Sequence, residues 1–355
     1  MFFCVVIVAC SDSDAVNSGT IINEEVTELL TKSPIRAVSV VFVADGSVET
    51  YHFGEFLDGT KPTDDSLYDI GSITKTYTGL VLAQAVTDGI IKLDAPISDY
   101  LPQLSQKAIK FNATEITIRD LATHLSGLPT DLACYDPNMH PAARLDCFLQ
   151  HDDNDLLKRL NDYTLNETPG SHYRYSNVGV RILGIILQQL YDKPLVQLFD
   201  SVVFQHTGQS DTHAHLATQD HARWHRGEHA NGIPTPDASS YFNSAGGLKS
   251  TVSDMGKYLK FYLQEDNFLA DTALTILAGE RDGLGRAYIW NTFQLDTEGQ
   301  YYHGGGTFGT SSWVSLYPSE KMAIYIVTPY VSESMQAELN VVANRFMQRY
   351  RQTKR

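Results

Sequence analysis

Ser72 and Lys75 combine a hydroxyl and an amine at a spacing of three residues, which places both side chains on one face of a helix. The stretch 69–84 has the pattern of a turn leading into a helix, so Ser72 is expected near the positive end of a helix dipole. An unprotonated lysine beside a serine can activate the hydroxyl as a nucleophile. An ordinary helix start with a capping serine gives the same pattern, so other residues must decide between the two.

Two later segments carry groups that suit the same chemistry. Tyr175 and Asn177 offer a phenol and an amide just before a helical stretch, and a second Tyr-x-Asn triple lies at 241–243. The run 303–306, His-Gly-Gly-Gly, precedes a strand pattern, where a free backbone N–H could face a developing oxyanion. Each segment also fits a loop whose polar groups satisfy the backbone, or a turn that needs positive φ.

In this order the three segments resemble the S-x-x-K, Y-x-N and K-T-G or H-x-G motifs of the serine β-lactamase and penicillin-binding-protein superfamily. The resemblance is to its class C-related branch, which includes β-lactamases, D-Ala-D-Ala carboxypeptidases, D-aminopeptidases and esterases. Segments 121–129 and 244–251 are similar to this branch as well, and the similarity spans about residues 35–330.

The resemblance implies an acyl-enzyme mechanism without a metal or organic cofactor. Ser72 would be acylated, and Lys75 and Tyr175 would transfer protons, with Tyr175 as the base for the deacylating water. Lys75 would then need burial or a nearby cation to be partly neutral. The remaining implied roles are substrate binding by Asn177, His303 and Gly305, and an oxyanion hole formed by the backbone N–H groups of Ser72 and Gly306.

One departure from the family pattern concerns the substrate. In K-T-G members the lysine and threonine help to bind a substrate carboxylate, whereas His303 and Gly304 stand here. They supply less fixed positive charge and no hydroxyl, which weakens the case for an efficient β-lactamase. An esterase, a D-aminopeptidase or a carboxypeptidase stays open, and the expected partners are a β-lactam, a D-amino-acid peptide or an ester.

Composition indicates a globular protein with a large core. The chain has 355 residues, 43% of them hydrophobic and 19% charged, and a formal net charge of −15. This charge argues against nucleic acid as a partner and against electrostatic binding to an anionic membrane face.

The N-terminal segment and the cysteines indicate export. Residues 1–9 are almost wholly apolar and too few to span a bilayer, and 7–10 resembles a bacterial lipobox with Cys10 as the lipidated residue. No Lys or Arg precedes the run, so a start further upstream stays open. We expect a periplasmic or cell-envelope protein, attached to a membrane only through this anchor. Cys134 and Cys147 then form a possible disulfide or two buried thiols.

Strand patterns near both chain ends enclose a mainly helical middle. A hairpin is predicted around Asp45-Gly46, helices at 23–31, 178–191, 253–264 and 332–350, and strands at 288–295, 310–317 and 322–328. We predict an α+β fold, an antiparallel sheet built from both ends and flanked by helices, with an inserted all-helical domain. The expected units are a signal segment 1–10, a linker and helix 11–34, a sheet domain 35–90 plus 241–355, and a helical domain 91–240.

Other residue clusters do not change this interpretation. Six histidines lie between 206 and 229, and the set His221, His225 and His229 has helical spacing that could bind zinc, although a polar surface loop fits better. The aspartates at 152, 153 and 155 resemble a helix start rather than a calcium loop. His124, Arg174 and Asn243 receive no role. A catalytically weak cell-wall binding or sensor protein on the same fold is the alternative from another functional class.

Overall fold

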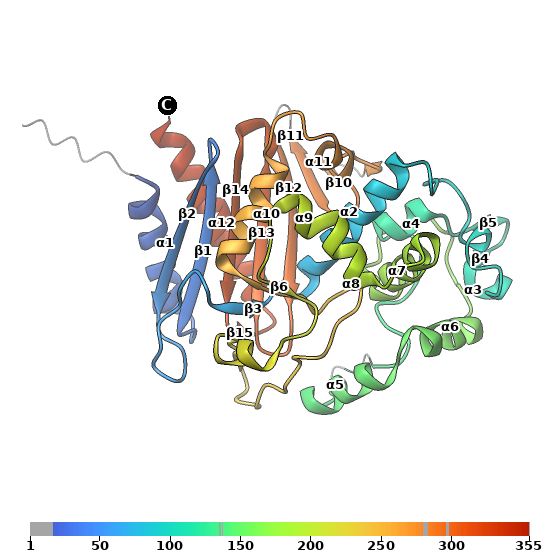
Figure 1. Cartoon of the computed structure of the whole chain (residues 1–355), viewed down its shortest axis with the longest axis horizontal. Helices are drawn as coiled ribbons and strands as arrows, with labels where there is room; N and C mark the ends of the chain where they lie inside the picture. Colours follow the sequence, from blue (N-terminus) through green and yellow to red (C-terminus); the bar gives the residue numbers. More distant parts are fainter. Residues whose placement is uncertain (1–16, 135, 137, 280–282, 296–297, 355) are drawn as a thin grey trace, which may run out of the picture.

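A computed structural model describes residues 17–134, 136, 138–279, 283–295 and 298–354, so the apolar run and Cys10 lie outside the described residues. Within them, an eight-stranded antiparallel sheet has the order β2-β1-β14-β13-β12-β11-β10-β9. Figure 1 shows that its strands come from both ends of the chain. The strands are β1 (Ala37–Ala44), β2 (Ser47–Gly54), β9 (Ala278–Gly279), β10 (Leu284–Arg286), β11 (Asn291–Leu295), β12 (Glu298–Gly306), β13 (Ser311–Tyr317) and β14 (Met322–Thr328).

The central strands are hydrophobic on both faces because helices cover both sides of the sheet. In β1, Val40 and Phe42 point to one core while Val41 and Val43 point to the other, as the two-residue period of a strand requires. β1 pairs with β14 in the register Val41 to Tyr325, which joins the N-terminal hairpin to the strands from the C-terminal part of the chain.

Two helices from opposite chain ends cover the outer face. α1 (Ser18–Lys32) and α12 (Met335–Thr353) pack on each other and on the sheet, and they bury Ile22, Val26 and Phe346. Arg349 ties the pair together through Glu25, which is 6% exposed. On the inner face, α2 (Thr74–Thr87), α10 (Val252–Tyr262) and α11 (Phe268–Ala273) contribute to the larger core.

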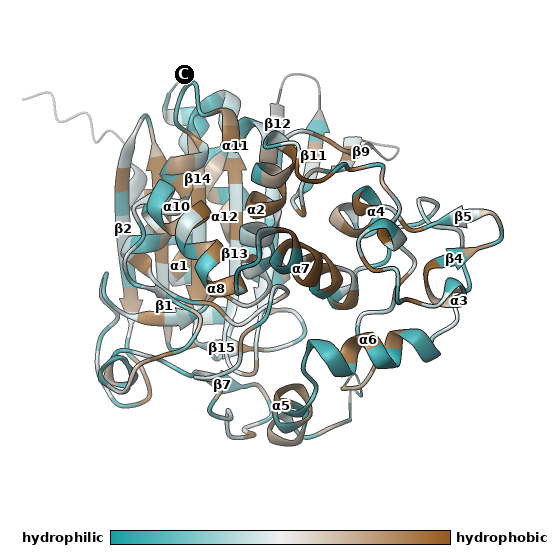
Figure 2. Cartoon of the chain, turned by 45° about the vertical axis from the view of Figure 1, so that its right-hand side comes forward, coloured by the Kyte–Doolittle hydropathy of each residue, from teal (hydrophilic) through white to brown (hydrophobic). Residues whose placement is uncertain are grey.

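The stretch between residues 91 and 240 is mainly helical, and Figure 2 shows its central helix, α7, as strongly hydrophobic. Its short strands β6 and β7 pair with β8 (Lys249–Thr251) and β15 (Tyr330–Val331), and β8 also pairs with β3 (Leu67–Asp69). Strands before residue 240 thus pair with strands after it, so the domain boundary predicted at residue 240 stays a proposal. The elements are α3 (Gln106–Ile109), β4 (Lys110–Phe111), β5 (Thr114–Glu115), α4 (Ile118–Thr123), α5 (Pro141–Gln150), α6 (Asp153–Asp162), α7 (Asn177–Tyr191), α8 (Leu195–Leu198), α9 (Gln205–Thr207), β6 (Thr212–His213) and β7 (Glu228–His229).

Several local features agree with the expectations, and one differs. The hairpin at Asp45-Gly46 is present, and Cys134 and Cys147, for which a disulfide and two buried thiols stayed open, are bonded to each other. Asp152 caps α6 by accepting from the N–H of Asp155, as a helix start requires. The glycine run 303–306 is predicted to lie just before a strand, but it forms the end of β12 itself, where it pairs with β13 and extends beyond the ladder to β11, and its glycines have no positive φ.

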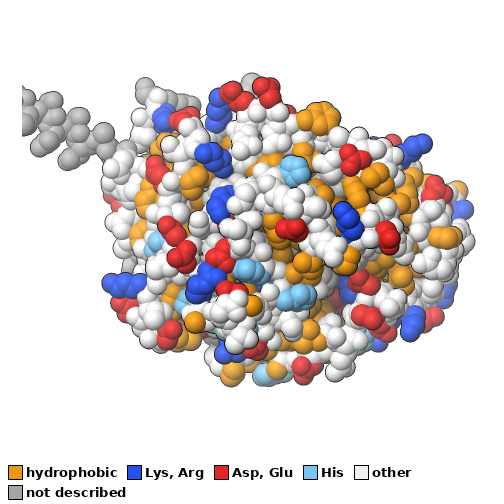
Figure 3. All heavy atoms as spheres, viewed as in Figure 1, with side chains coloured by type: hydrophobic (Ala, Val, Ile, Leu, Met, Phe, Trp, Pro, Cys, Tyr) orange, Lys and Arg blue, Asp and Glu red, His pale blue; other side chains and the backbone are white. Residues whose placement is uncertain are grey.

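Charged side chains of both signs are interspersed over the face shown in Figure 3, with histidines among them. Among the described residues, no helix has the length and apolar character needed to cross a membrane.

Candidate active site

Ser72 lies in a tight 3-10 turn, Gly71–Ile73, that runs directly into α2. This turn places Ser72 Oγ at the N-terminal end of the helix while Lys75 points inward one turn later. The Lys75 Nζ atom lies 3.0 Å from Ser72 Oγ. The predicted contact between the two side chains is therefore present.

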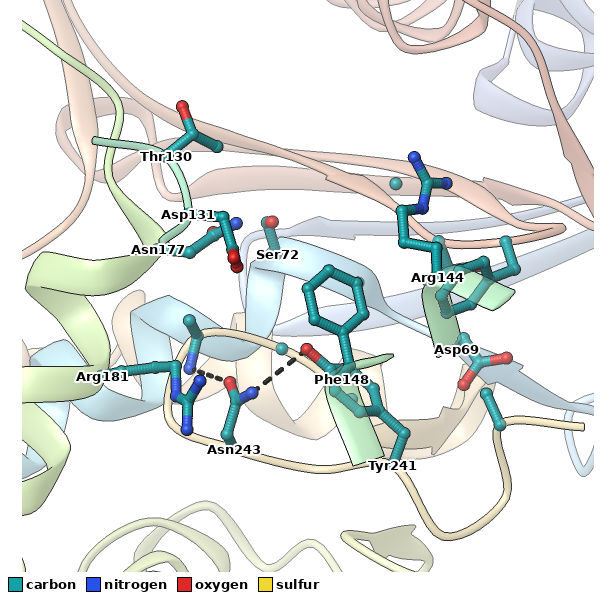
Figure 4. Close-up of a pocket in the computed structure, with 18 residues that line it drawn as sticks. Asp69, Ser72, Thr130, Asp131, Arg144, Phe148, Asn177, Arg181, Tyr241 and Asn243 are labelled. Carbon is teal, nitrogen blue, oxygen red and sulfur yellow. Dashed lines mark hydrogen bonds between the residues drawn. The ribbon is translucent and has the colours of Figure 1, made fainter. Parts of the chain in front are cut away.

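Lys75 is completely buried, and its partners leave its charge uncompensated. Nζ donates to the carbonyl of Ala245 besides Ser72 Oγ. Burial lowers the pKa of Lys75 from 10.5 to about 7, because a desolvated ammonium without an anion is costly. Asn243 fixes Ala245 by accepting from its N–H at 2.8 Å, so the second Tyr-x-Asn segment supports Lys75 indirectly (Figure 4).

Tyr175 completes the contacts to the serine. Its hydroxyl lies 2.7 Å from Ser72 Oγ, and burial raises the phenol pKa far above its ordinary value, against a smaller lowering by the Ser72 hydrogen bond. The phenol is thus protonated near neutral pH. Tyr175 immediately precedes α7, whose N-cap is Ser176, with its side chain accepting from the N–H of Gly179.

Two glycines allow the serine turn to lie directly against β12. A Cβ on Gly71, whose φ is +57°, would meet the N atom of Gly306 at 2.6 Å. A Cβ on Gly305 would meet the carbonyl oxygen of Ile70 at 2.2 Å. Glycine at both positions therefore permits the approach that brings the backbone of Gly306 beside Ser72.

Two neutral histidines flank Tyr175. His303 lies 6.4 Å from it between ring centroids, and His124 lies 4.8 Å from it. Burial first, and then the nearby Lys75 charge, lower the pKa of His303 to about 4 and that of His124 well below its ordinary value. His303 Nδ1 donates to the Gly304 carbonyl at 2.7 Å, so its Nε2 is an unprotonated acceptor.

A cavity of about 220 Å³ opens beside Ser72 and continues past the end of β12, where Gly306, Thr307 and Phe308 line it. Figure 4 shows Asn177 and Asp131 near Ser72, with Phe148 and Arg144 on another wall. The Asp131 carboxylate is fixed by the N–H groups of Ala133 and Cys134, both at 2.8 Å, and Arg144 lies over the Phe308 ring.

The structure thus brings Ser72, Lys75 and Tyr175 into direct contact and places Asn177 and Gly306 at the same cavity. His303 and Gly305 lie beside them on β12. Sequence reasoning missed Asp131, Arg144 and Phe148 as lining residues. The sequence signal that could have found them was the Cys134–Cys147 pair, because Arg144 lies within the loop that these cysteines close and the other two residues lie just outside it.

The histidine segment does not form a zinc site on a helical face. His221 lies in a 3-10 turn, His225 stacks on Phe56, and His229 lies in β7. The three histidines therefore do not share a helix, and their sequence spacing does not place them on one helical face. Among the described residues, Asp211, His213 and Asp220 come close enough to hold a cation, but Arg223 pairs with both aspartates.

A family model described as Beta-lactamase matches residues 22–343. The chain belongs to the Beta-lactamase family. It is 27% identical over 306 residues to the Escherichia coli K12 protein "D-alanyl-D-alanine-carboxypeptidase/endopeptidase AmpH", covering 80% of this chain and 77% of that one. It is 24% identical over 350 residues to a Providencia stuartii "Beta-lactamase", covering 86% and 85%.

Solved structures of the Beta-lactamase family have the same fold. The class C β-lactamase from Rhodobacter sphaeroides matches with a TM-score of 0.77 at 20% identity, covering 93% of this chain and 99% of that one. Family membership makes the protein a serine hydrolase with an α+β fold.

Proposed function

We propose that the protein is an exported hydrolase that forms an acyl-enzyme on Ser72 with amide, peptide or ester substrates. The observation that carries this proposal is the position of Ser72 Oγ, 3.0 Å from Lys75 Nζ and 2.7 Å from the Tyr175 hydroxyl. The Lys75 amine is partly neutral near pH 7 and can accept a proton, while the Tyr175 phenol is protonated and can donate one.

The acylation step follows from this arrangement. Ser72 Oγ bonds to the substrate carbonyl carbon and its proton passes to Lys75. The bond to the leaving group then breaks, the leaving group takes the phenol proton of Tyr175, and Lys75 returns a proton to the phenol. The developing oxyanion would accept from the backbone N–H groups of Ser72 and Gly306.

Deacylation runs the same proton path in reverse. Water attacks the ester carbonyl and gives a proton to Tyr175 as the phenol passes its own proton to Lys75. The ester bond then breaks, Lys75 returns that proton to Ser72 Oγ, and the carboxylic acid product leaves. Because Tyr175 is protonated in the free enzyme, we propose Lys75 as the resting base. Tyr175 serves as the water's base only by passing the proton on.

The neutral state of His303 bears on the substrate. With a pKa of about 4, His303 carries no charge near neutral pH and cannot attract a carboxylate as a lysine would. The names of the relatives above support both peptidase and β-lactamase activity. We propose that esters and amides without a carboxylate next to the scissile bond react faster than penicillins.

The test is a time course of intact protein mass with benzylpenicillin and, separately, with a p-nitrophenyl ester. We expect an acyl adduct and p-nitrophenol release that Ser72→Ala abolishes. A persistent penicilloyl adduct would indicate a penicillin-binding protein, and rapid turnover a β-lactamase. If the wild type forms no adduct and hydrolyses neither compound, the enzyme proposal is wrong and the binding or sensor alternative replaces it.

Export is the second part of the proposal. The disulfide between Cys134 and Cys147 supports it, since such bonds persist in oxidising compartments. Lipidation at Cys10 is tested by Cys10→Ser, which should release the protein from the membrane fraction. A wild-type protein found only in the cytoplasm would contradict export.

A further inference from the structure

His124 contacts three consecutive residues centred on Tyr175, although it lies about fifty positions earlier in the chain. Its carbonyl oxygen accepts from the backbone N–H of Arg174 at 2.8 Å. Its Nδ1 atom accepts from the backbone N–H of Ser176 at 3.2 Å. Its ring lies against the Tyr175 ring at 4.8 Å between centroids. One residue therefore fixes the backbone on both sides of Tyr175 and packs on its side chain.

The backbone of His124 has an uncommon conformation that these contacts require. It is the C-cap of α4, with φ 58° and ψ 32°, in the left-handed region that non-glycine residues rarely adopt. Glycine would adopt this conformation without strain, but it has no ring and no acceptor for Ser176. The strain is therefore offset by side-chain contacts that run to the Tyr175 segment.

The burial and tautomer of His124 make it a fixed support. The residue is 2% exposed and neutral, and since Nδ1 accepts from an N–H, the proton lies on Nε2. Nε2 is buried without a partner among the described residues, which is costly for a polar atom, so the ring orientation is set by its other contacts. His124 forms no hydrogen bond with Ser72 or Lys75, so its packing contact with the reacting hydroxyl is indirect and runs through Tyr175.

We infer that His124 is the positioning residue that holds the Tyr175 hydroxyl on Ser72 Oγ. This inference rests on the proposed function, because its importance lies in proton transfer at Ser72. It also makes a structural prediction that does not depend on activity. When the His124 side chain is replaced, the Tyr175 hydroxyl should lose its 2.7 Å contact with Ser72 Oγ.

The decisive test is a double-mutant cycle with Tyr175→Phe, measured on a p-nitrophenyl ester and by the labelling rate of Ser72 with a fluorophosphonate. His124→Phe keeps an aromatic ring but removes the acceptor and worsens the backbone strain. We expect it to lower kcat by about 10–100-fold with little change in KM. In the Tyr175→Phe background the same change should cost less than about threefold, because the hydroxyl it positions is absent.

Two further variants separate positioning from general stability. His124→Asn tolerates the left-handed conformation and can still accept from the Ser176 N–H, so it should recover most of the activity lost in His124→Phe. Asp192→Phe is the matched control, because Asp192 is the left-handed C-cap of α7 (φ 49°) and is exposed. It should lower the melting temperature without changing kcat.

Independent, additive losses in the double mutant would overturn the inference, as would an asparagine variant as slow as the phenylalanine variant. An inactive wild type would defeat the proposed function instead. In that case a crystal structure of His124→Phe still decides, since an unchanged distance between the Tyr175 hydroxyl and Ser72 Oγ would refute positioning.

Discussion

In the proposed reaction, proton transfer at Ser72 depends on Lys75 and Tyr175, whose pKa values burial shifts in opposite directions. Burial lowers the pKa of Lys75 to about 7 and raises that of Tyr175. The amine can therefore be neutral while the phenol is protonated at the same pH. This difference gives the base and the acid of the proposed reaction their separate roles.

Activity should depend on the ionisation of Lys75. Since the neutral amine is required, kcat/KM for a p-nitrophenyl ester should rise with pH and level off above about pH 7. Lys75→Arg, which stays charged, should lose at least about 1000-fold at every pH. A profile that is flat from pH 5 to pH 9 would show that Lys75 is not the base.

The burial of Lys75 should also lower the free energy of unfolding. Its pKa is about 7 in the folded protein and 10.5 when exposed, so the unfolded chain binds more protons between these values. The free energy of unfolding should therefore rise with pH across this window. Lys75→Met should raise it by about 1–3 kcal/mol at pH 7 and by less near pH 10. Denaturant unfolding at both pH values measures this, and an equal effect at the two would contradict the low pKa.

At the scale of elements, the close approach of the serine turn and β12 depends on the absence of side chains. Gly305→Ala would place a methyl group 2.2 Å from the Ile70 carbonyl oxygen, so the strand and the turn must separate. We expect at least a 100-fold loss of kcat and a lower melting temperature. Gly279→Ala is the matched control, since its Cβ would lie in open space on β9, and it should change neither value.

The segment closed by the disulfide supplies one wall of the cavity but none of the groups that contact Ser72. Replacing Cys134 and Cys147 by serine removes a short-loop crosslink worth about 3 kcal/mol on the chain-entropy model. Arg144 and Phe148, which both lie on α5, should then be held less firmly. We expect KM to rise more than kcat falls, measured with a peptide or an ester substrate, and a selective fall in kcat would contradict this.

These elements show where sequence reasoning succeeded and where it could not. The contact between Ser72 and Lys75 was predictable from their three-residue spacing, whereas Tyr175 was singled out only through the resemblance of its motif to a known family. β1 and β14 were predictable because their apolar runs are long. β12 was missed as a strand because Gly304, Gly305 and Gly306 have low strand propensity, and only their pairing with β13 makes them part of a strand, since the ladder to β11 ends at Tyr302. The role of His124 depends on contacts across fifty residues, which no local pattern encodes.

At the scale of the whole molecule, the sheet separates the site from a second core. α1 and α12 pack on the outer face, and Phe346 is fully buried there. Ser72 lies on the inner side, next to α2. Stability and catalysis should therefore be separable by mutations on the outer face.

Phe346→Ala should lower the free energy of unfolding by about 3–5 kcal/mol and leave kcat of the folded protein unchanged. Val341→Ala on the same helix, where the side chain is 47% exposed, should cost less than about 0.5 kcal/mol. Denaturant unfolding and specific activity at low temperature provide both measurements. A large fall in kcat for Phe346→Ala would show that the outer core is coupled to the site.

The pairing of β1 with β14 has a consequence for the timing of folding during synthesis. Ser39 pairs with Val327, so the first hairpin cannot find its neighbour until almost the whole chain has left the ribosome. Gly306, which faces the serine turn, is also translated late. A nascent chain therefore carries its nucleophile for most of its synthesis without the strand that would stabilise a reacting carbonyl. The hydrolase can therefore become active only after its C-terminal strands have been made.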